Sequence, residues 1–274
     1  MKNMATVKAR KVWLVLAAVC IAFCGAQAAT RYWTGAGGDC EWTNSVNWSG
    51  SAVPKSGDTA VFTNDAPLGL RFHATGYPGA SHYRFIGKDV FIGSDEGKRK
   101  NLYLYGTSTC KVEVVEGTTV TISNSLSMYN ADNKGLVKTG KGTFRYLGRG
   151  GATSNIDNAK ELIVEEGEFG GMPSSGDYGV YLTIPTNITV KSGATLFMAG
   201  YNALNEDHTV IYLESNATFR VDTRGSQDFI AGISGAGAIV TPASKTANLK
   251  LSFKKGPCEF SGTTDSRVTL EFLD

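Results

Sequence analysis

The chain has 274 residues, with 27 Lys and Arg against 25 Asp and Glu, and a formal net charge of +2. Four of the basic residues and none of the acidic ones lie in the first 28 residues, so the remainder has 23 basic and 25 acidic side chains and a net charge of −2. That remainder is long enough to bury a large core. Without a basic excess it lacks the attraction for nucleic acid or anionic lipid on which those classes of binding protein depend.

The first 28 residues have the pattern of a secretory signal peptide. A basic stretch that ends at Lys11 precedes an apolar run at residues 12–23, which is short for a membrane span. The small residues of Ala26-Gln27-Ala28 then form a cleavage pattern. We therefore expect the protein to be exported, to be secreted or held at the cell surface, and to have no membrane insertion after cleavage.

Residues 29–100 are rich in Trp and Gly and are predicted to form an N-terminal cap that leads into the first rungs of a repeat. Trp33, Trp42 and Trp48 lie close together in this region. Exposed rings could stack on sugars and make a carbohydrate-binding site, whereas buried rings would form the core of the cap. Both interpretations stay open, and burial is favoured because Trp usually hides much of its area.

The same region has four residues with side-chain oxygen atoms of the type that calcium prefers. They are Asp39, Asn44, Asn47 and Asp58. Their spacing matches no calcium loop, and we interpret them as turn-forming residues. The three histidines of the chain share no metal-ligand spacing. They are His73, His82 and His208. The sequence therefore predicts no metal site and no other cofactor.

From residue 101 onward, short segments of β-branched and aromatic residues alternate with Gly, Asn and Asp turns. Seven bulky residues recur there at intervals of 20–27 residues, each just after a Gly, Asn or Pro corner. They are Val120, Phe144, Phe169, Leu196, Phe219, Ile239 and Phe260. Such a period is the signature of stacked repeat units. For residues 101–274 we predict an all-β fold, a β-solenoid of about seven or more rungs, with a β-sandwich as the alternative.

Strand pleating assigns faces to the neighbours of these seven residues, because successive side chains point to opposite sides. The positions expected to point inward with them are Ile122, Tyr146, Gly171, Met198, Val221, Thr241 and Gly262. One expected outward column is Thr121, Arg145, Gly170, Phe197, Arg220, Val240 and Ser261. The other is Thr119, Thr143, Glu168, Thr195, Thr218, Ala238 and Glu259. Phe197 differs from its polar neighbours and is a candidate surface contact.

Acidic residues that could serve a glycosidase or a polysaccharide lyase are scattered along the chain. They are Glu165, Glu166 and Glu168, then Asp207 with His208, then Asp222 and Asp228 with Arg224. Neither outward column places acidic residues on adjacent rungs. We therefore assign no catalytic residue, and the sequence leans against an enzyme.

Three cysteines follow the leader, and they are far apart: Cys40, Cys110 and Cys258. Export would permit a disulfide, but an odd count leaves at least one thiol unpaired. No pair can be assigned from the sequence. We favour their role as small buried apolar residues.

Residues 135–148, GLVKTGKGTFRYLG, resemble the core K-x-G-x-G-T-L-x-L-x-G of autotransporter-associated β-strand repeats. Residues 162–169 and 188–196 resemble further strands of this family, and Asn47-Trp48 resembles the start of such proteins. The resemblance implies a right-handed parallel β-helix that bacteria export to the cell surface or beyond, and it implies no single activity. We expect a passenger-like helix without a translocator barrel, since too few residues follow the repeats.

These patterns favour a secreted or cell-surface β-helical protein of structural or adhesion type, which presents a rod-like surface. One alternative is an extracellular carbohydrate-binding module that uses Trp33, Trp42 and Trp48. A less favoured alternative is a polysaccharide lyase or glycosidase. The expected partners are extracellular polysaccharide or cell-surface components, and the oligomeric state stays open.

Overall fold

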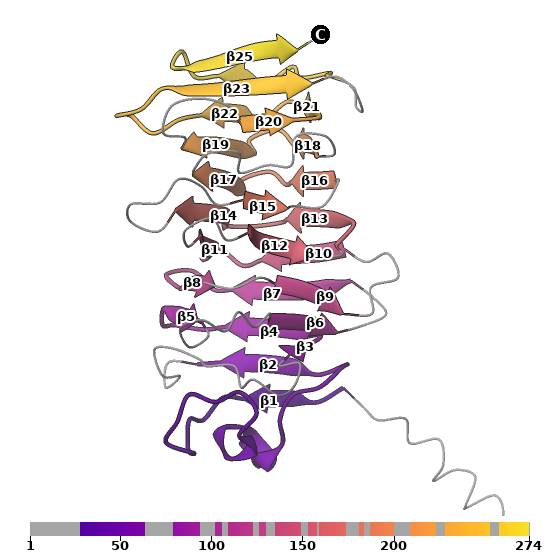
Figure 1. The fold of residues 1–274 in the computed structure, drawn as a ribbon, viewed down its shortest axis with the longest axis vertical. Coiled ribbons are helices and arrows are strands. Elements are labelled where there is room, and N and C mark those ends of the chain that lie inside the picture. Colours follow the sequence, from indigo (N-terminus) through magenta and orange to yellow (C-terminus); the bar gives the residue numbers. More distant parts are fainter. Residues whose placement is uncertain are drawn as a thin grey trace, which may run out of the picture.

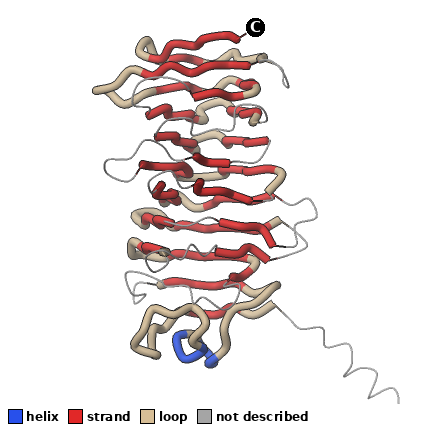
Figure 2. The backbone as a smooth tube through the Cα atoms, in the orientation of Figure 1, coloured by secondary structure: helices blue, strands red, loops and turns tan. Residues whose placement is uncertain are grey.

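The described strands of the chain lie one above another along a rod, from the N-terminal end (indigo) to the C-terminal end (yellow; Figure 1). The computed structural model describes residues 28–63, 79–93, 102–105, 109–122, 126–129, 135–148, 153–157, 159–173, 181–183, 187–199, 209–222, 228–252 and 258–273. Within these ranges, Figure 2 shows helix only at the N-terminal end, where η1 (Ser45–Asn47) and η2 (Ser49–Ser51) are short 3-10 turns.

The rod has three sides, each built from β-strands that run in parallel. The first side is a nine-stranded sheet with the order β1 (Thr30–Tyr32), β2 (Thr59–Phe62), β4 (His82–Phe85), β7 (Cys110–Val114), β10 (Gly135–Thr139), β13 (Glu161–Val164), β16 (Asn187–Val190), β18 (Val210–Leu213) and β21 (Gly232–Gly235). The second side is an eight-stranded sheet with the order β5 (Val90–Ile92), β8 (Thr119–Ile122), β11 (Thr143–Gly148), β14 (Glu168–Pro173), β17 (Thr195–Ala199), β19 (Thr218–Asp222), β22 (Ala238–Val240) and β24 (Thr263–Thr264).

The third side consists of two smaller sheets. The five-stranded sheet is β3 (Gly79–Ala80), β6 (Leu102–Tyr105), β9 (Leu126–Tyr129), β12 (Thr153–Asp157) and β15 (Tyr181–Thr183). The three-stranded sheet is β20 (Asp228–Ile230), β23 (Ala247–Ser252) and β25 (Val268–Leu273). The pairings between strands on all three sides are parallel.

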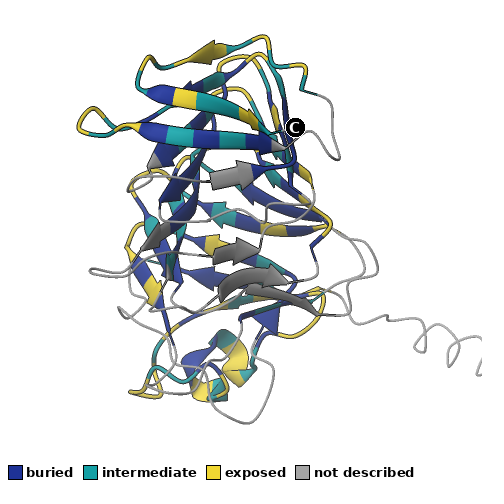
Figure 3. Ribbon diagram, turned by 45° about the horizontal axis from the view of Figure 1, so that its top comes forward, coloured by how far each residue is buried: buried dark blue, intermediate teal, exposed yellow. Residues whose placement is uncertain are grey.

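The chain visits the three sides in the same order in each turn, and this makes the fold a parallel β-solenoid of about six turns. The turns with a described strand on every side are β4–β5–β6, β7–β8–β9, β10–β11–β12, β13–β14–β15, β18–β19–β20 and β21–β22–β23. The predicted all-β solenoid is thus confirmed, with slightly fewer turns than the seven or more expected. Figure 3 shows how buried and more exposed positions alternate along the strands, as pleating requires.

Six of the seven recurring apolar residues pair in register on the eight-stranded side and are buried. They are Val120, Phe144, Phe169, Leu196, Phe219 and Ile239. Val90 pairs with Val120 and extends this ladder toward the N-terminus, a member that the period search missed. The inward partners expected beside the ladder also pair in one row, from Ile122 through Tyr146, Gly171 and Met198 to Val221.

The seventh assignment, Phe260, is wrong. Ile239 pairs with Thr264, whereas Phe260 bridges to Gly235 on the nine-stranded side. The Phe260 ring is partly buried against the core from that side, so its apolar character does not mark the ladder. Three further assignments shift with it, because β24 begins later than expected. They are inward Gly262 and outward Ser261 and Glu259.

The chain turns a corner between the nine-stranded and the eight-stranded side in each turn. The backbone conformation at this corner explains why a Gly or Asn precedes the apolar residues of the ladder. A residue with left-handed backbone stands at these corners: Gly87, Gly117, Gly140, Gly167, Gly193 and Asn216. Residues with a Cβ rarely adopt this conformation, and glycine does so without steric cost. At Gly140, φ is 75°, and an added Cβ would also lie 2.4 Å from the Val114 carbonyl oxygen of the previous turn.

One inward position carries a lysine. Lys138 pairs with Val112 and Val164, both buried, and its own side chain is buried with them. Its ammonium group donates to the carbonyl oxygen of Gly140 at 2.6 Å and to that of Glu166 at 2.7 Å. Burial lowers the pKa of Lys138 to about 8, although the Glu166 and Glu168 carboxylates act to raise it. The ammonium group therefore ties the corners of two successive turns together from inside the core.

The N-terminal cap is closed by three tryptophans. Trp33, Trp42 and Trp48 are all buried, and the Trp48 ring lies 5.0 Å from that of Trp33 and 4.6 Å from that of Trp42, centroid to centroid. The Trp48 indole N–H donates to the Trp42 carbonyl oxygen at 2.8 Å. Phe62 of β2 lies within 5.7 Å of Trp48, and Phe85 stacks on Phe62. The cap thus continues the aromatic core of the first turns.

Cys40, Cys110 and Cys258 are free thiols in the structure. Cys110 is buried in β7, as the preferred interpretation expected, and Cys40 and Cys258 are partly exposed. In the part of the chain that the structure describes, no helix is long and apolar enough to cross a membrane.

Candidate functional site

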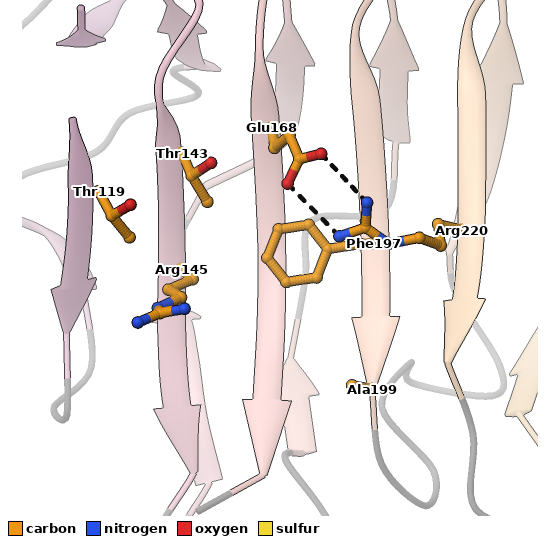
Figure 4. Close-up of a pocket in the computed structure, with 7 residues that line it drawn as sticks. All are labelled: Thr119, Thr143, Arg145, Glu168, Phe197, Ala199 and Arg220. Atoms are coloured by element: carbon orange, nitrogen blue, oxygen red, sulfur yellow. Dashed lines mark hydrogen bonds and ion pairs between the residues drawn. The ribbon is translucent and has the colours of Figure 1, made fainter. Parts of the chain in front are cut away.

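A small groove lies on the outer face of the eight-stranded side. Its volume is about 160 Å³. Seven side chains from β8, β11, β14, β17 and β19 line it, and Figure 4 shows how they lie: Thr119, Thr143, Arg145, Glu168, Phe197, Ala199 and Arg220. A concave surface with several convergent polar groups is a candidate binding site.

Two outward rows bring these residues together. In one row Thr119 pairs with Thr143, and Thr143 pairs with Glu168. The neighbouring row runs from Arg145 through Gly170 and Phe197 to Arg220, one residue per turn. Adjacent strands lie about 4.8 Å apart, so residues far apart in the sequence become close neighbours. Both rows contain the outward residues expected from pleating.

Glu168 and Arg220 form one wall of the groove. Two Arg220 nitrogens donate to the two Glu168 carboxylate oxygens at 3.1 and 3.4 Å, and Figure 4 shows this pair of contacts. The guanidinium carbon also lies 4.8 Å from the centroid of the Phe197 ring, a cation–π distance. Since Phe197 stands on the strand between the two charged residues, the three side chains span three consecutive turns.

The floor of the groove depends on Gly170. A Cβ at this position would lie 1.9 Å from the Phe197 carbonyl oxygen and 2.6 Å from the Phe197 ring. The ring therefore lies directly against the Gly170 backbone, where no other residue would leave room. The sequence correctly predicted that Phe197 points outward. Its contact with Gly170 explains why it is nevertheless only 3% exposed.

Arg145 forms the opposite wall. Its Nε donates to the Thr121 hydroxyl of the previous turn at 2.9 Å, and this contact orients the guanidinium group along the row. Thr119 and Thr143 line the groove on the same outer face. The lining residues therefore comprise the guanidinium groups of Arg145 and Arg220, two hydroxyls, one carboxylate paired with Arg220, and the border of an aromatic ring.

This set of groups suits binding better than hydrolysis. Glycoside hydrolysis in most families needs two carboxyl groups on either side of the bond that is cleaved. Among the seven lining residues only Glu168 carries a carboxylate, and both of its oxygens accept hydrogen bonds from Arg220. The neighbouring Glu165 and Glu166 are exposed at the corner before β14.

The three tryptophans proposed as carbohydrate-binding residues lie elsewhere, inside the cap. Trp33, Trp42 and Trp48 pack their rings against one another and are at most 2% exposed. A sugar could reach these ring faces only if the cap opened. In this structure the tryptophans fill a core and do not line the groove.

The oxygen-bearing residues of the cap take part in turns. Asp39 accepts hydrogen bonds from the Glu41 backbone N–H and from the amide side chains of Asn44 and Asn47. These contacts, first that from Asn44, lower the pKa of Asp39. Asp58 accepts from the backbone N–H groups of Ala29 and Lys55. Their oxygen atoms hold loops in place, which agrees with the turn interpretation.

The other sequence candidates are dispersed or lie outside the described residues. His82 accepts a hydrogen bond from the Lys111 N–H at 3.2 Å, and burial followed by the charge of Lys111 lowers its pKa. His73, Asp207, His208 and Arg224 lie outside the described residues, as do the side chains of Asp222 and Asp228. Within the described ranges, no group of three His, Cys, Asp or Glu side chains is placed to hold a metal ion.

Sequence reasoning missed the ion pair that shapes the groove. Glu168 and Arg220 are 52 residues apart, and each was placed in a different outward column. The repeat interval could have revealed it, because a separation of 52 residues corresponds to two turns of this solenoid. Comparison with known proteins adds no assignment, because no family model, no curated protein and no solved structure matches this chain.

Proposed function

We propose that this chain is a secreted or cell-surface β-helical protein of structural or adhesion type, which presents the sides of its rod to a partner. The observation that carries this proposal is the continuous stack of about six turns closed by a tryptophan core at its N-terminal end. Such a stack fixes outward side chains in rows at constant spacing. Its regularity suits a surface for display, and fold alone assigns no chemistry.

The proposal of export depends on the leader. Residues 1–28 combine a basic start, an apolar run and a small-residue cleavage pattern. The likeness of residues 135–148 to autotransporter-associated β-strand repeats supports the same proposal, including a bacterial source. In that family the helix is a passenger, which works outside the cell.

A second candidate, an extracellular carbohydrate-binding module, is favoured by the groove and not by the tryptophans. Thr119, Thr143, Arg145 and Glu168 provide donors and acceptors on an accessible face. An enzyme is a weaker candidate, because the groove offers a single carboxylate that is already paired.

Export is tested by producing the full chain in a bacterial host and locating it. We expect the product found outside the cytoplasm to begin at Ala29. An Ala28→Arg variant should keep its leader, since a bulky charged residue breaks the cleavage pattern. Cytoplasmic protein that still begins at Met1 would overturn the proposal of secretion.

Adhesion is tested by coating particles with the purified chain and measuring their retention on bacterial cells and on polysaccharide-coated plates. Retention above that of albumin-coated particles is expected. If the particles coated with the chain are retained no better than the albumin-coated particles on every surface, an adhesion role is excluded and a purely structural one is left.

A further inference from the structure

We propose that removal of the leader creates an ion pair in the cap, in which the α-ammonium group of Ala29, formed by cleavage after Ala28, binds the Asp58 carboxylate. The inference rests on the proposed function in one respect, since it takes the export signal to be cleaved between these two alanines. It makes Asp58 a receptor site for the processed N-terminus.

The backbone nitrogen of Ala29 already lies at the carboxylate. Its N–H donates to Asp58 Oδ1 at 2.9 Å. The Ala29 carbonyl oxygen accepts from the Thr59 N–H at 2.8 Å, and Thr30 pairs with Thr59 at the start of β1 and β2. Because Ala29 is bound through both of its backbone groups, an amino group formed there stays where the amide nitrogen lies now.

Asp58 is held in place by its own turn and by the next turn of the solenoid. Its backbone N–H donates to the Lys55 carbonyl oxygen at 3.0 Å, and its Oδ2 accepts from the Lys55 N–H at 3.1 Å. Its carbonyl oxygen accepts from the N–H groups of Ser81 and His82 at 3.0 and 3.2 Å. The carboxylate is therefore positioned before any processing and needs no rearrangement to receive an amino group.

The carboxylate is buried, and its described partners carry no charge. Asp58 is 2% exposed, and the two groups described as donating to its side chain are the N–H groups of Ala29 and Lys55. A buried charge is costly unless an opposite charge accompanies it. Cleavage after Ala28 turns one of these neutral donors into an ammonium group without moving it. A hydrogen bond between two ionised groups is roughly twice as strong as one between neutral groups.

The surroundings of Ala29 leave room for the new charge. Ala28 is exposed and Ala29 is partly buried. An ammonium group has three donors, so one can serve Asp58 while the others reach water. The precursor lacks this ion pair, and the cap therefore gains its full stability only after the leader has been removed.

An insertion of Gly-Ser-Gly between Ala28 and Ala29 of the full chain tests the charge. Parent and variant are produced in an exporting bacterial host, and mass spectrometry identifies the first residue of each processed product. The variant keeps the Ala29 N–H as a neutral donor and moves the amino group three residues away. We expect its thermal midpoint to be about 2–4 °C lower, as for the loss of charge assistance in one hydrogen bond.

Asp58→Asn and Asp39→Asn are the matched variants. Asparagine at position 58 keeps an oxygen that can accept from Ala29 but has no charge, so the insertion should lower its midpoint by less than about 1 °C. Asp39 is an exposed carboxylate of the same cap, bonded to Glu41, Asn44 and Asn47. In Asp39→Asn the insertion should act as it does in the parent chain.

Labelling of the α-amino group is a second measurement, and it keeps the test decisive if Asp58→Asn does not fold. Near pH 7 an amine-reactive ester modifies the unprotonated amine. An ammonium group bound to a buried carboxylate releases its proton less readily. We expect the amino group of the processed parent to react about tenfold more slowly than that of the insertion variant.

The proposal is overturned if the insertion leaves the midpoint or the labelling rate unchanged, if its effect persists in Asp58→Asn, or if the exported product begins at another residue. In each of these cases export itself stands. If the chain stays in the cytoplasm, a site-specific protease sequence in place of residues 25–28 releases Ala29 from the purified chain. Stabilisation on that cleavage would contradict secretion alone, and no stabilisation would overturn both proposals.

Discussion

Glu168 and Arg220 meet across a strand that belongs to neither of them. The carboxylate on β14 and the guanidinium group on β19 are joined at 3.1 and 3.4 Å over β17, with Phe197 beside the guanidinium. Most side-chain contacts on a solenoid face link adjacent turns. This one links turns two apart and holds the intervening ring against Gly170.

The strength of this contact can be measured by a double-mutant cycle of Glu168→Gln and Arg220→Gln. Both side chains are about one-third exposed, so we expect a coupling free energy of only about 0.5–1 kcal/mol, reduced at high salt. Urea unfolding of the four proteins provides the values. In the Arg84–Glu113 pair the arginine is more exposed, at 49% against 32% for Arg220. This pair should therefore show a smaller coupling, and equal couplings would show that exposure of the arginine does not decide the strength of the pair.

Lys138 should make stability depend on pH in an unusual direction. Its pKa is about 8 in the folded chain and 10.5 when unfolded. Below pH 8 the lysine is protonated in both states. Between pH 8 and 10.5 the unfolded chain binds more protons, so the free energy of unfolding rises with pH. The gain levels off above 10.5 and amounts to about 3 kcal/mol at most.

The Lys138→Met variant isolates this effect, because other groups titrate equally in both proteins. The difference in free energy of unfolding, wild type minus variant, should increase between pH 8 and 10.5. It should stay constant between pH 6 and 7. A difference that does not change across the whole range would show that the ammonium group keeps its ordinary pKa, held by the carbonyl oxygens of Gly140 and Glu166.

The cap should be sensitive to Trp48→Ala. This substitution removes the ring that contacts both Trp33 and Trp42, together with the hydrogen bond to the Trp42 carbonyl. We expect a loss of about 3–5 kcal/mol in the free energy of unfolding, as for other large-to-small changes in a core. Tyr32→Ala is the control in the same region, since Tyr32 is 48% exposed, and should cost less than about 0.5 kcal/mol. Similar losses for both would contradict a structural role for Trp48.

Glycine is required at Gly170 and at Gly193 for two different reasons, lack of space and backbone conformation. An added Cβ at Gly170 would meet the Phe197 carbonyl oxygen at 1.9 Å, whereas at Gly193 it would meet nothing within 4 Å, although φ is 80°. Gly193→Ala should therefore cost only the strain of a left-handed residue, about 1–2 kcal/mol. Gly170→Ala must displace a strand and should cost about 3 kcal/mol or more. Chemical denaturation measures both, and equal costs would show that the sheet adjusts at Gly170.

The sequence predicted the ladder well because apolar side chains at one position of each turn must face the same core. Val120, Phe144 and Phe169 follow that rule, and their register was correct. Phe260 did not follow it, because it bridges to Gly235 on the nine-stranded side and Thr264 occupies the ladder position. Apolar character alone does not reveal such a shift in register.

The groove was only partly predictable. Pleating placed Phe197, Arg145 and Arg220 on the outer face correctly, because alternation depends only on local sequence. It did not predict that Phe197 would be covered, since that depends on Gly170 one turn before and Arg220 one turn after. Lys138 was missed for a related reason: a charged residue in an inward row satisfies its hydrogen bonds only through the corners of its own turn and of the next turn.

In a parallel solenoid, the position of a residue in the sequence also gives its height along the axis of the rod. Each turn advances the chain by about 4.8 Å, so a substitution acts on neighbours one turn earlier and later more than on residues beside it in the chain. Insertions at a corner would project sideways and leave the register of the remaining turns unchanged. Variation in this protein is therefore best compared turn by turn, with each residue matched to its partners in the ladder.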